Sequence, residues 1–150
     1  MSALSRMLYV SRKQVDTDDH AAMTALMEQA AVNNARNRIT GLLTWSEDAF
    51  LQLLEGPRSA LTELLFRLKD DPRHDGLLLV EFRAAPGRVA QRWAMAAPEP
   101  QARAALADLT YERVRTICPD TLIGRLSEVE ASTALSIMSQ LGADGDVVLV

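Results

Sequence analysis

The segment FLQLLEG, residues Phe50–Gly56, decides how this chain must fold. Side chains along a β-strand alternate between its two faces, so Gln52 shares one face with the residues two before and two after it, while Leu51 and Leu53 point the other way. Apart from Gln52, residues 50–54 are apolar on both faces, which predicts a strand covered on both sides. An amide buried without partners costs about 1–3 kcal/mol, so Gln52 needs a polar partner.

Strand and helix patterns alternate on both sides of this segment. Apolar residues at every second position predict strands, and apolar residues at helical spacing predict helices. The expected order is strand 4–11, helix 19–35, strand 39–45, a polar turn at 46–48, strand 49–55, helix 59–70, strand 77–82 and a short fifth strand within 92–96. The continuous apolar run at 77–80 predicts a fourth strand buried on both faces. This is the β-α-β-β-α-β order of a ferredoxin-like α+β fold with an extra fifth strand.

A boundary with two prolines separates these elements from the last third of the chain. Apolar spacing predicts one helix over residues 102–109, and a capping-box pattern predicts a second that begins at Ser127 and ends at Gly142. About fifty residues are few for an independent core. We therefore expect residues 1–97 to form the domain and residues 98–150 to form a two-helix cap on the opposite sheet face, where the leucines of FLQLLEG would meet it.

Composition restricts the class of protein. The 150 residues are 48% hydrophobic and 24% charged, which suits one globular domain. The net charge of −4 gives no support to nucleic-acid binding, which needs clustered basic residues. No apolar run approaches the roughly 20 residues of a membrane span. A single cysteine, Cys118, excludes an intrachain disulfide and favours a cytoplasmic location.

The sequence offers little support for an enzyme. His20 and His74 lie far apart, without a nearby cluster of cysteines or carboxylates, so we expect no metal site. There is no glycine-rich phosphate loop. Cys118 has no evident base beside it, and a buried structural thiol is the better interpretation.

Four polar side chains fit their elements poorly. Tyr9 lies on an apolar strand, Gln52 lies in FLQLLEG, and Asn33 and Asn34 stand where alanine would continue the first helix better. The first and third strands are neighbours in this topology, so these side chains could meet beneath the helices and bind a planar ligand with polar edges. Two simpler interpretations stay open: the asparagines could cap the helix, and Tyr9 could point its hydroxyl into water.

The ordered set of motifs resembles the BLUF family, the sensors of blue light using FAD. The resemblance covers roughly residues 3–97, and it rests on LYVS around Tyr9, NNARNRITGLL at 33–43, FLQLLEG at 50–56, DDPRH at 70–74 and WAM at 93–95. Because only the expected cap follows residue 97, we expect a short, stand-alone member of the family that is a photoreceptor rather than an enzyme.

The resemblance implies that FAD binds between the two helices, with its ring against the sheet. It implies that Tyr9 is the electron donor to the photoexcited flavin and that Gln52, between them, changes its hydrogen bonds. Asn33 and Asn34 would bind the ring edge. Arg67 and Asp71, placed by their position in the second helix, would contact the ribityl or phosphate part of FAD.

Trp93 and Met95 match the mobile pair of the fifth strand that relays the change, although both would usually be core residues. The resemblance further implies a downstream protein partner, and we also expect a homo-oligomer. Two positions depart from the commoner family pattern. Arg38 stands where glycine is frequent, and Trp45 stands where phenylalanine or tyrosine is common, so Trp45 could compete as an electron donor.

Two alternatives use the same fold. One is a ferredoxin-like interaction module without a cofactor. The other is a small acylphosphatase-like hydrolase, which would need a phosphate-binding loop after the first strand, where SRKQVDTDDH contains no glycine. The sequence leaves open the identity of the partner, the oligomeric state, the dark-recovery rate and the role of the apolar tail at residues 147–150.

Overall fold

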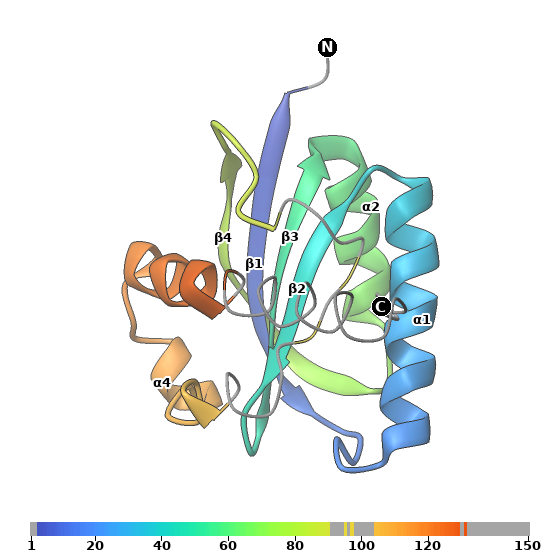
Figure 1. Cartoon of the computed structure of the whole chain (residues 1–150), viewed down its shortest axis with the longest axis vertical. Helices are drawn as coiled ribbons and strands as arrows, with labels where there is room; N and C mark the ends of the chain where they lie inside the picture. The colour runs from blue at the N-terminus through green and yellow to red at the C-terminus, as the bar shows by residue number, and fades with distance from the viewer. Residues whose placement is uncertain (1–2, 91–94, 96, 98–103, 130, 132–150) are drawn as a thin grey trace, which may run out of the picture.

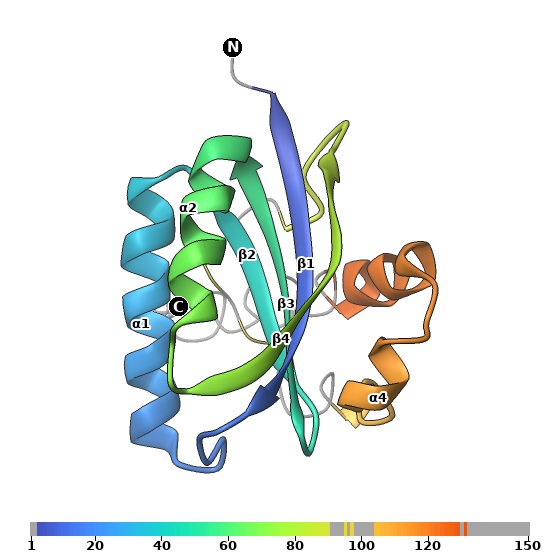
Figure 2. The same ribbon diagram turned by 180° about the vertical axis from the view of Figure 1, so that it is seen from behind.

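The computed structural model describes residues 3–90, 95, 97, 104–129 and 131. Its elements are β1 (Leu4–Lys13), α1 (His20–Arg36), β2 (Thr40–Trp45), β3 (Ala49–Pro57), α2 (Arg58–Lys69), β4 (His74–Ala84) and α4 (Tyr111–Val114), and a helical segment begins at residue 119 and includes residues up to 129. Figure 1 and the reverse view in Figure 2 show three layers, with the sheet between α1 and α2 on one side and the C-terminal segments on the other.

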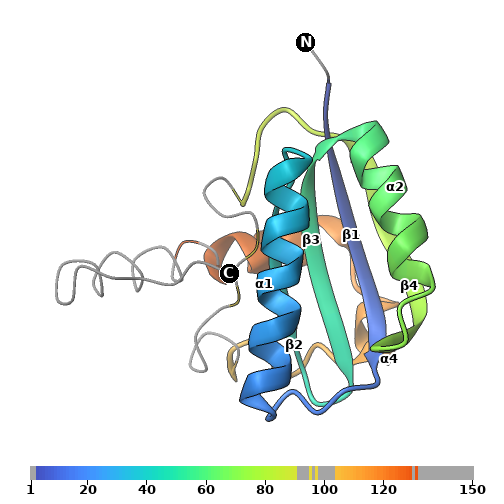
Figure 3. The ribbon, with the colours of Figure 1, turned by 90° about the vertical axis from the view of Figure 1, so that its right-hand side faces the viewer.

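The strands pair in the order β2-β3-β1-β4, and every neighbouring pair is antiparallel. This confirms the ferredoxin-like α+β fold. The two strand–helix–strand connections place α1 and α2 on the same face of the sheet, and strands β3 and β1 are visible between them in Figure 3. We call this face the helix face, and the face covered by residues 104–129 the C-terminal face.

The alternation within FLQLLEG divides the interior into two cores. On the helix face, Phe50 and Leu54 pack with side chains of β1, α1 and α2, together with Met95. On the C-terminal face, Leu51 and Leu53 pack against the last described third of the chain. The contributions from that third are Leu106, Leu109, Tyr111, Val114, Leu122, Ile123, Leu126 and Val129. The expectation that Leu51 and Leu53 meet C-terminal residues is therefore confirmed.

The ends of α1 follow from local chemistry. The Asp19 side chain accepts a hydrogen bond from the Ala22 amide at 3.1 Å and caps the first turn. The helix continues past Asn33 and Asn34 and ends with Asn37 at the C-cap, so the interpretation of the two asparagines as capping residues is wrong. Arg38 then takes a left-handed backbone conformation, with φ of 60°.

The expected burial of the fourth strand on both faces is wrong. β4 pairs only with β1 and forms an edge of the sheet among the described strands, so its apolar run is only partly covered. Leu79 is 41% exposed, and Leu77, Leu78 and Val80 are half-buried. Sequence periodicity cannot separate an apolar edge strand from a central one, because the difference lies in the strand order.

The C-terminal elements also differ from expectation. Ser127 lies inside the helical segment that begins at residue 119, where its hydroxyl donates to the Ile123 carbonyl at 2.9 Å, so it does not cap a helix. Residues 105–108 form turns rather than a helix. Cys118 is exposed, not buried, because it lies in the link between α4 and the helical segment. The expected fifth strand, apart from Met95, and the tail at 147–150 lie outside the described residues.

The left-handed turn generates a stability prediction. Arg38→Gly should raise the free energy of unfolding by about 0.5–1 kcal/mol, because glycine adopts this conformation without the Cβ clash, while its larger unfolded-state entropy offsets part of the gain. Urea unfolding would measure the change. The matched control is Arg36→Gly, which lies in the last helical turn and should lower stability by about 0.5–1 kcal/mol. A loss of stability in Arg38→Gly would contradict the strain argument.

Candidate functional site

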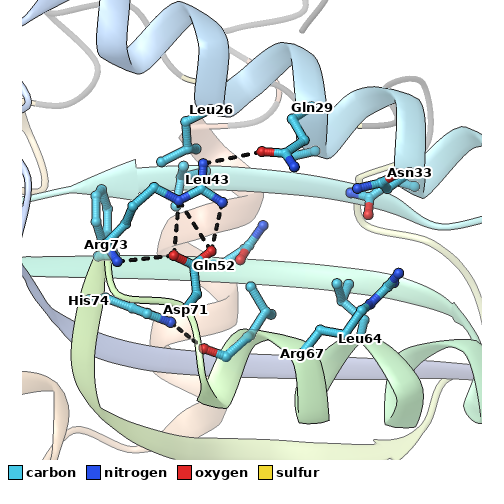
Figure 4. Close-up of a pocket in the computed structure, with 14 residues that line it drawn as sticks. Leu26, Gln29, Asn33, Leu43, Gln52, Leu64, Arg67, Asp71, Arg73 and His74 are labelled. Atoms are coloured by element: carbon cyan, nitrogen blue, oxygen red, sulfur yellow. Dashed lines mark hydrogen bonds and ion pairs between the residues drawn. The ribbon is translucent and has the colours of Figure 1, made fainter.

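A groove lies between α1 and α2, with β3 at its floor (Figure 4). Its volume is about 850 Å³, including the part that is open to solvent. Leu26, Ala30, Leu43, Phe50, Leu64 and Leu68 give it apolar walls, and Gln29, Asn33, Asn34, Gln52, Arg67, Asp71, Arg73 and His74 give it polar edges. The residues come from both helices, three strands and the turn after α2, so only the folded chain assembles the groove.

Tyr9 and Gln52 meet beneath the groove. They are direct partners in the antiparallel pairing of β1 with β3, and both point to the helix face. Tyr9 is 3% exposed and Gln52 is 6% exposed. The Tyr9 hydroxyl donates to Gln52 Oε1, and Gln52 Nε2 donates to Met95 Sδ at 3.7 Å. A thioether sulfur is a weak acceptor, so the amide is held firmly at its oxygen and loosely at its nitrogen.

The pKa of Tyr9 is raised well above its ordinary value. Burial is the largest cause, because it disfavours the phenolate, and the charge of Asp71 raises the pKa further. The guanidinium of Arg73 acts in the opposite direction and offsets part of the increase. Tyr9 therefore keeps its proton at neutral pH and remains the donor in its bond to Gln52.

Asp71 and Arg73 form an ion pair at the edge of the groove (Figure 4). Arg73 Nη2 donates to Asp71 Oδ2 at 2.6 Å, and the Arg73 amide donates to Asp71 Oδ1 at 3.0 Å. These hydrogen bonds lower the pKa of Asp71. Arg73 Nη1 also donates to Gln29 Oε1 on α1 at 3.4 Å, so this side chain reaches across the groove.

His74 supports the floor from below. Its Nε2 lies 2.6 Å from the Leu68 carbonyl oxygen, and its Nδ1 lies 2.6 Å from Ser11 Oγ. A carbonyl oxygen can only accept, so Nε2 carries a hydrogen, and in the neutral ring Nδ1 accepts from the Ser11 hydroxyl. The ring stands edge-on to Tyr9, with ring centroids 5.9 Å apart. His74 thus links the end of α2 to β1 beside the Tyr9 phenol.

The structure brings together most of the residues expected from the sequence. Asn34 is 2% exposed and Asn33 is half-buried, and both line the groove from the end of α1. Arg67 is exposed and lies on the last turn of α2, whereas Asp71 lies in the turn after that helix rather than within it. Trp93 lies outside the described residues.

Sequence reasoning missed Arg73 and His74 as members of the site. Both belong to the DDPRH segment, but only Asp71 was singled out there. The signal that would have identified Arg73 is its spacing, because an arginine two residues after an aspartate can fold back onto the carboxylate. Nothing local predicts the contact of His74 with Ser11, which depends on the pairing of β4 with β1.

The groove fits a flat aromatic ligand with polar edges and a phosphate-bearing tail. Apolar side chains from α1, α2 and the sheet would cover the two faces of a ring system. Asn33, Asn34 and Gln52 offer amide donors and acceptors for a ring edge. Arg67 is a cation suited to phosphate at the solvent side. A flavin dinucleotide has this combination of features, so the groove is suited to bind a flavin.

Comparison with known families identifies the chain. The model of the family described as sensors of blue-light using FAD, BLUF, matches residues 4–96. The chain therefore belongs to the BLUF family, whose cofactor is FAD and whose role is to sense blue light.

Individual relatives agree with this assignment. The photoactivated adenylate cyclase subunit beta of Euglena gracilis is 37% identical over 67 residues, which cover 45% of this chain and 8% of the relative. The dark-state structure of BlrB, a BLUF protein, has a TM-score of 0.65 and 28% identity over 85% of this chain and 98% of its own. Klebsiella pneumoniae BlrP1, as its manganese and cyclic diGMP complex, has a TM-score of 0.62 and 26% identity over 85% of this chain and 33% of its own.

The matched region is a small part of the curated relatives. The chain spans between 8% and 13% of the length of the Euglena proteins. Within the part of the chain that the structure describes, no helix is long and apolar enough to cross a membrane.

The raised pKa of Tyr9 predicts how stability depends on pH. In the unfolded chain Tyr9 loses its proton near its ordinary pKa of about 10, but in the folded chain it keeps the proton to higher pH, so stability should fall as pH rises above about 10. The stability of the Tyr9→Phe variant should fall less steeply with pH, with a slope that is smaller by up to about 1.4 kcal/mol per pH unit. Urea unfolding between about pH 9 and about pH 11 would measure both slopes.

The range below about pH 9 serves as the control for this measurement. Between neutral pH and about pH 9 the two proteins should show parallel curves, because Tyr9 is protonated in both states there. Equal slopes above pH 10 would contradict the burial of an uncharged phenol.

Proposed function

We propose that Tyr9 and Gln52 form the photochemical switch of this BLUF domain. The observation that carries the proposal is the buried hydrogen bond from the Tyr9 hydroxyl to Gln52 Oε1 at the floor of a groove that fits a flavin. When bound, FAD supplies blue-light absorption and a strongly oxidising excited state. The chain's own residues position the cofactor and form hydrogen bonds with it, and the Tyr9 phenol provides an electron and a proton.

Gln52 is suited to change its hydrogen bonds. Its amide has an acceptor at one end and donors at the other, so it can rotate or tautomerise and exchange one set of partners for another. In the structure its oxygen accepts from Tyr9 and its nitrogen donates to Met95 Sδ. Once Tyr9 has given up its electron and proton to the excited cofactor, its oxygen would have no hydrogen to donate, so the interaction that holds Gln52 Oε1 would be lost. The weak bond to Met95 adds little resistance to the exchange.

The remaining groove residues are proposed to bind the cofactor. Asn34 and Asn33 bind the ring edge, since both line the groove at the end of α1. Arg67 binds phosphate from the last turn of α2. Asp71, held by Arg73, presents carboxylate oxygens to hydroxyl groups of the ribityl chain.

The proposed output passes through Met95 and Trp93 to the C-terminal residues. Met95 contacts Gln52 directly, and residues 104–129 cover the other sheet face. We propose residues 1–97 as the sensor domain and residues 98–150 as its output extension, which would bind a downstream effector protein. The photoactivated adenylate cyclase subunit among the relatives supports the proposal of a downstream effector. Self-association and a cytoplasmic location are parts of the same proposal.

The alternative of a cofactor-free module has a clear test. Protein that is colourless as purified and does not take up FAD would support it. The family match argues against the acylphosphatase-like alternative, because it assigns residues 4–96 to the sensors of blue light using FAD.

The central prediction concerns the photocycle. FAD-loaded protein should be yellow, and blue light should give a small, reversible red shift of the flavin absorption. Tyr9→Phe removes the phenolic electron and proton donor, and Gln52→Leu removes the amide, so either change should abolish the shift. Visible absorption spectra before and after illumination would measure it.

Tyr111→Phe is the matched control for this experiment. Tyr111 is buried on the C-terminal face, where its hydroxyl donates to the Gly76 carbonyl at 2.6 Å, so its loss should leave the red shift in place. A normal photocycle in Tyr9→Phe or in Gln52→Leu would overturn the assigned switch.

The role of Arg67 predicts a difference between two flavins. Arg67→Ala should weaken binding of FAD by about 10-fold to 100-fold, because a charge-assisted hydrogen bond to phosphate contributes about 1.5–3 kcal/mol. Binding of riboflavin, which has no phosphate, should not change. Titrations followed by flavin fluorescence would give both affinities. Arg58→Ala, at the exposed start of the same helix, should alter neither, and equal losses for both flavins in Arg67→Ala would refute a phosphate contact.

A further inference from the structure

Tyr111, the first residue of α4, makes polar contacts that the proposed switch does not use. Its side chain is 9% exposed and packs on the C-terminal face. The Tyr111 hydroxyl donates to the Gly76 carbonyl on β4 at 2.6 Å. The Tyr111 amide donates to Asp48 Oδ1, in the turn before β3, at 3.2 Å. The Arg12 guanidinium lies over the Tyr111 ring, 4.8 Å from its centroid. One side chain thus joins the C-terminal face to the end of the sheet.

The first residues of β4 are held at this junction from two elements. Arg12 Nε and Gln14 Nε2 donate to the two oxygens of Asp75 at 2.9 and 3.0 Å. Gly76 has a φ of 58°, and a Cβ there would lie 3.1 Å from Tyr111 Oη and 2.7 Å from Arg12 Nη2. Glycine therefore permits both side chains to approach the β4 backbone closely. Figure 3 shows α4 beside the end of β1 and the start of β4.

His74 connects this junction to Tyr9. It lies two residues before Gly76 and is 8% exposed. Its ring stands edge-on to the Tyr9 ring, with centroids 5.9 Å apart. Because the ring is attached to the backbone that Tyr111 and Arg12 hold, the position of that backbone determines how the ring meets Tyr9. An unbroken series of contacts and covalent bonds therefore joins Tyr111 to Tyr9.

We propose that Tyr111 is a positioning residue through which residues 104–129 act on the switch: by holding the first residues of β4, its hydroxyl fixes the His74 ring against Tyr9. The inference rests on the proposed role of Tyr9, and it adds a route to Tyr9 that does not pass through Met95. Coupling between two sites is reciprocal. A protein partner that displaces Tyr111 from Gly76 would therefore alter the switch without entering the groove.

The test uses the full chain loaded with FAD, in which two tyrosines and two histidines give few signals to assign. Tyrosine is labelled with ¹³C at Cζ and histidine with ¹⁵N in the ring. In the dark, Tyr111→Phe should make the Nε2 hydrogen of His74 exchange with water about twofold to tenfold faster, because one hydrogen bond that holds β4 is lost. The Tyr9 signal should shift, because Cζ carries the hydroxyl that donates to Gln52.

Val114→Ala is the matched control. Val114 is 1% exposed on the same short helix, so this change loosens packing on the C-terminal face but keeps the Tyr111 hydroxyl. It should lower stability and leave the His74 exchange rate and the Tyr9 signal unchanged. Equal effects in the two variants would indicate general loosening and would overturn the proposal, as would an unchanged His74 exchange rate in Tyr111→Phe.

Dark recovery gives a second measurement that loss of packing alone should not change. Recovery ends when the Tyr9 hydroxyl again donates to Gln52 Oε1, and a less firmly placed phenol reaches this geometry less often. Tyr111→Phe should therefore keep the red shift but recover at least twofold more slowly, whereas Val114→Ala should recover at the wild-type rate. Wild-type recovery in Tyr111→Phe would contradict the proposed route.

Arg12→Gln keeps the proposal falsifiable if Tyr111→Phe does not fold. The Arg12 side chain is 53% exposed, so its replacement should be tolerated, and it removes the guanidinium from both Tyr111 and Asp75. The same faster exchange at His74 is expected, and an unchanged rate would refute the route. The exchange rate in the dark does not depend on a photocycle, so it tests this inference even if the wild-type protein shows no red shift, a result that would instead refute the assigned switch.

Discussion

The hydrogen bond between Tyr9 and Gln52 is the contact on which the rest of the site depends. It forms only because β1 and β3 pair in the register that places these two residues opposite each other. A slip of one residue would turn Gln52 toward the C-terminal face and place a leucine beneath the groove. The register is held by apolar side chains on both faces of β3, so the two cores that stabilise the fold also align the donor and acceptor of this hydrogen bond.

The surroundings of this bond keep it in one protonation state. Burial raises the pKa of Tyr9, and the carboxylate of Asp71 raises it further, while Arg73 holds that carboxylate in its charged form. His74 bridges the end of α2 to β1 beside the phenol. The polar edge of the groove therefore has two effects: it presents groups to a cofactor, and it favours the neutral, hydrogen-donating phenol.

The two faces of the sheet hold separate groups of buried residues. The helix face contains the groove, Gln52 and Met95, whereas the C-terminal face contains the apolar contacts of residues 104–129 and the buried Glu55. The chain after β4 is bound on the C-terminal face at Ala90 and on the helix face at Met95.

The sequence by itself determined the order of strands and helices up to β4 and the alternation of FLQLLEG, and its family motifs predicted several residues that line the groove. These features are local or periodic: alternation identifies β3, helical spacing identifies α1 and α2, and Asp19 marks a helix start. It predicted the burial of the fourth strand, the start of the last helix and the burial of Cys118 wrongly, because each depends on which elements become neighbours. Only the tertiary structure decided that β4 is an edge strand, that His74 reaches Ser11, and that Glu55 binds amides more than thirty residues away. Such contacts join distant segments, and no local propensity encodes them.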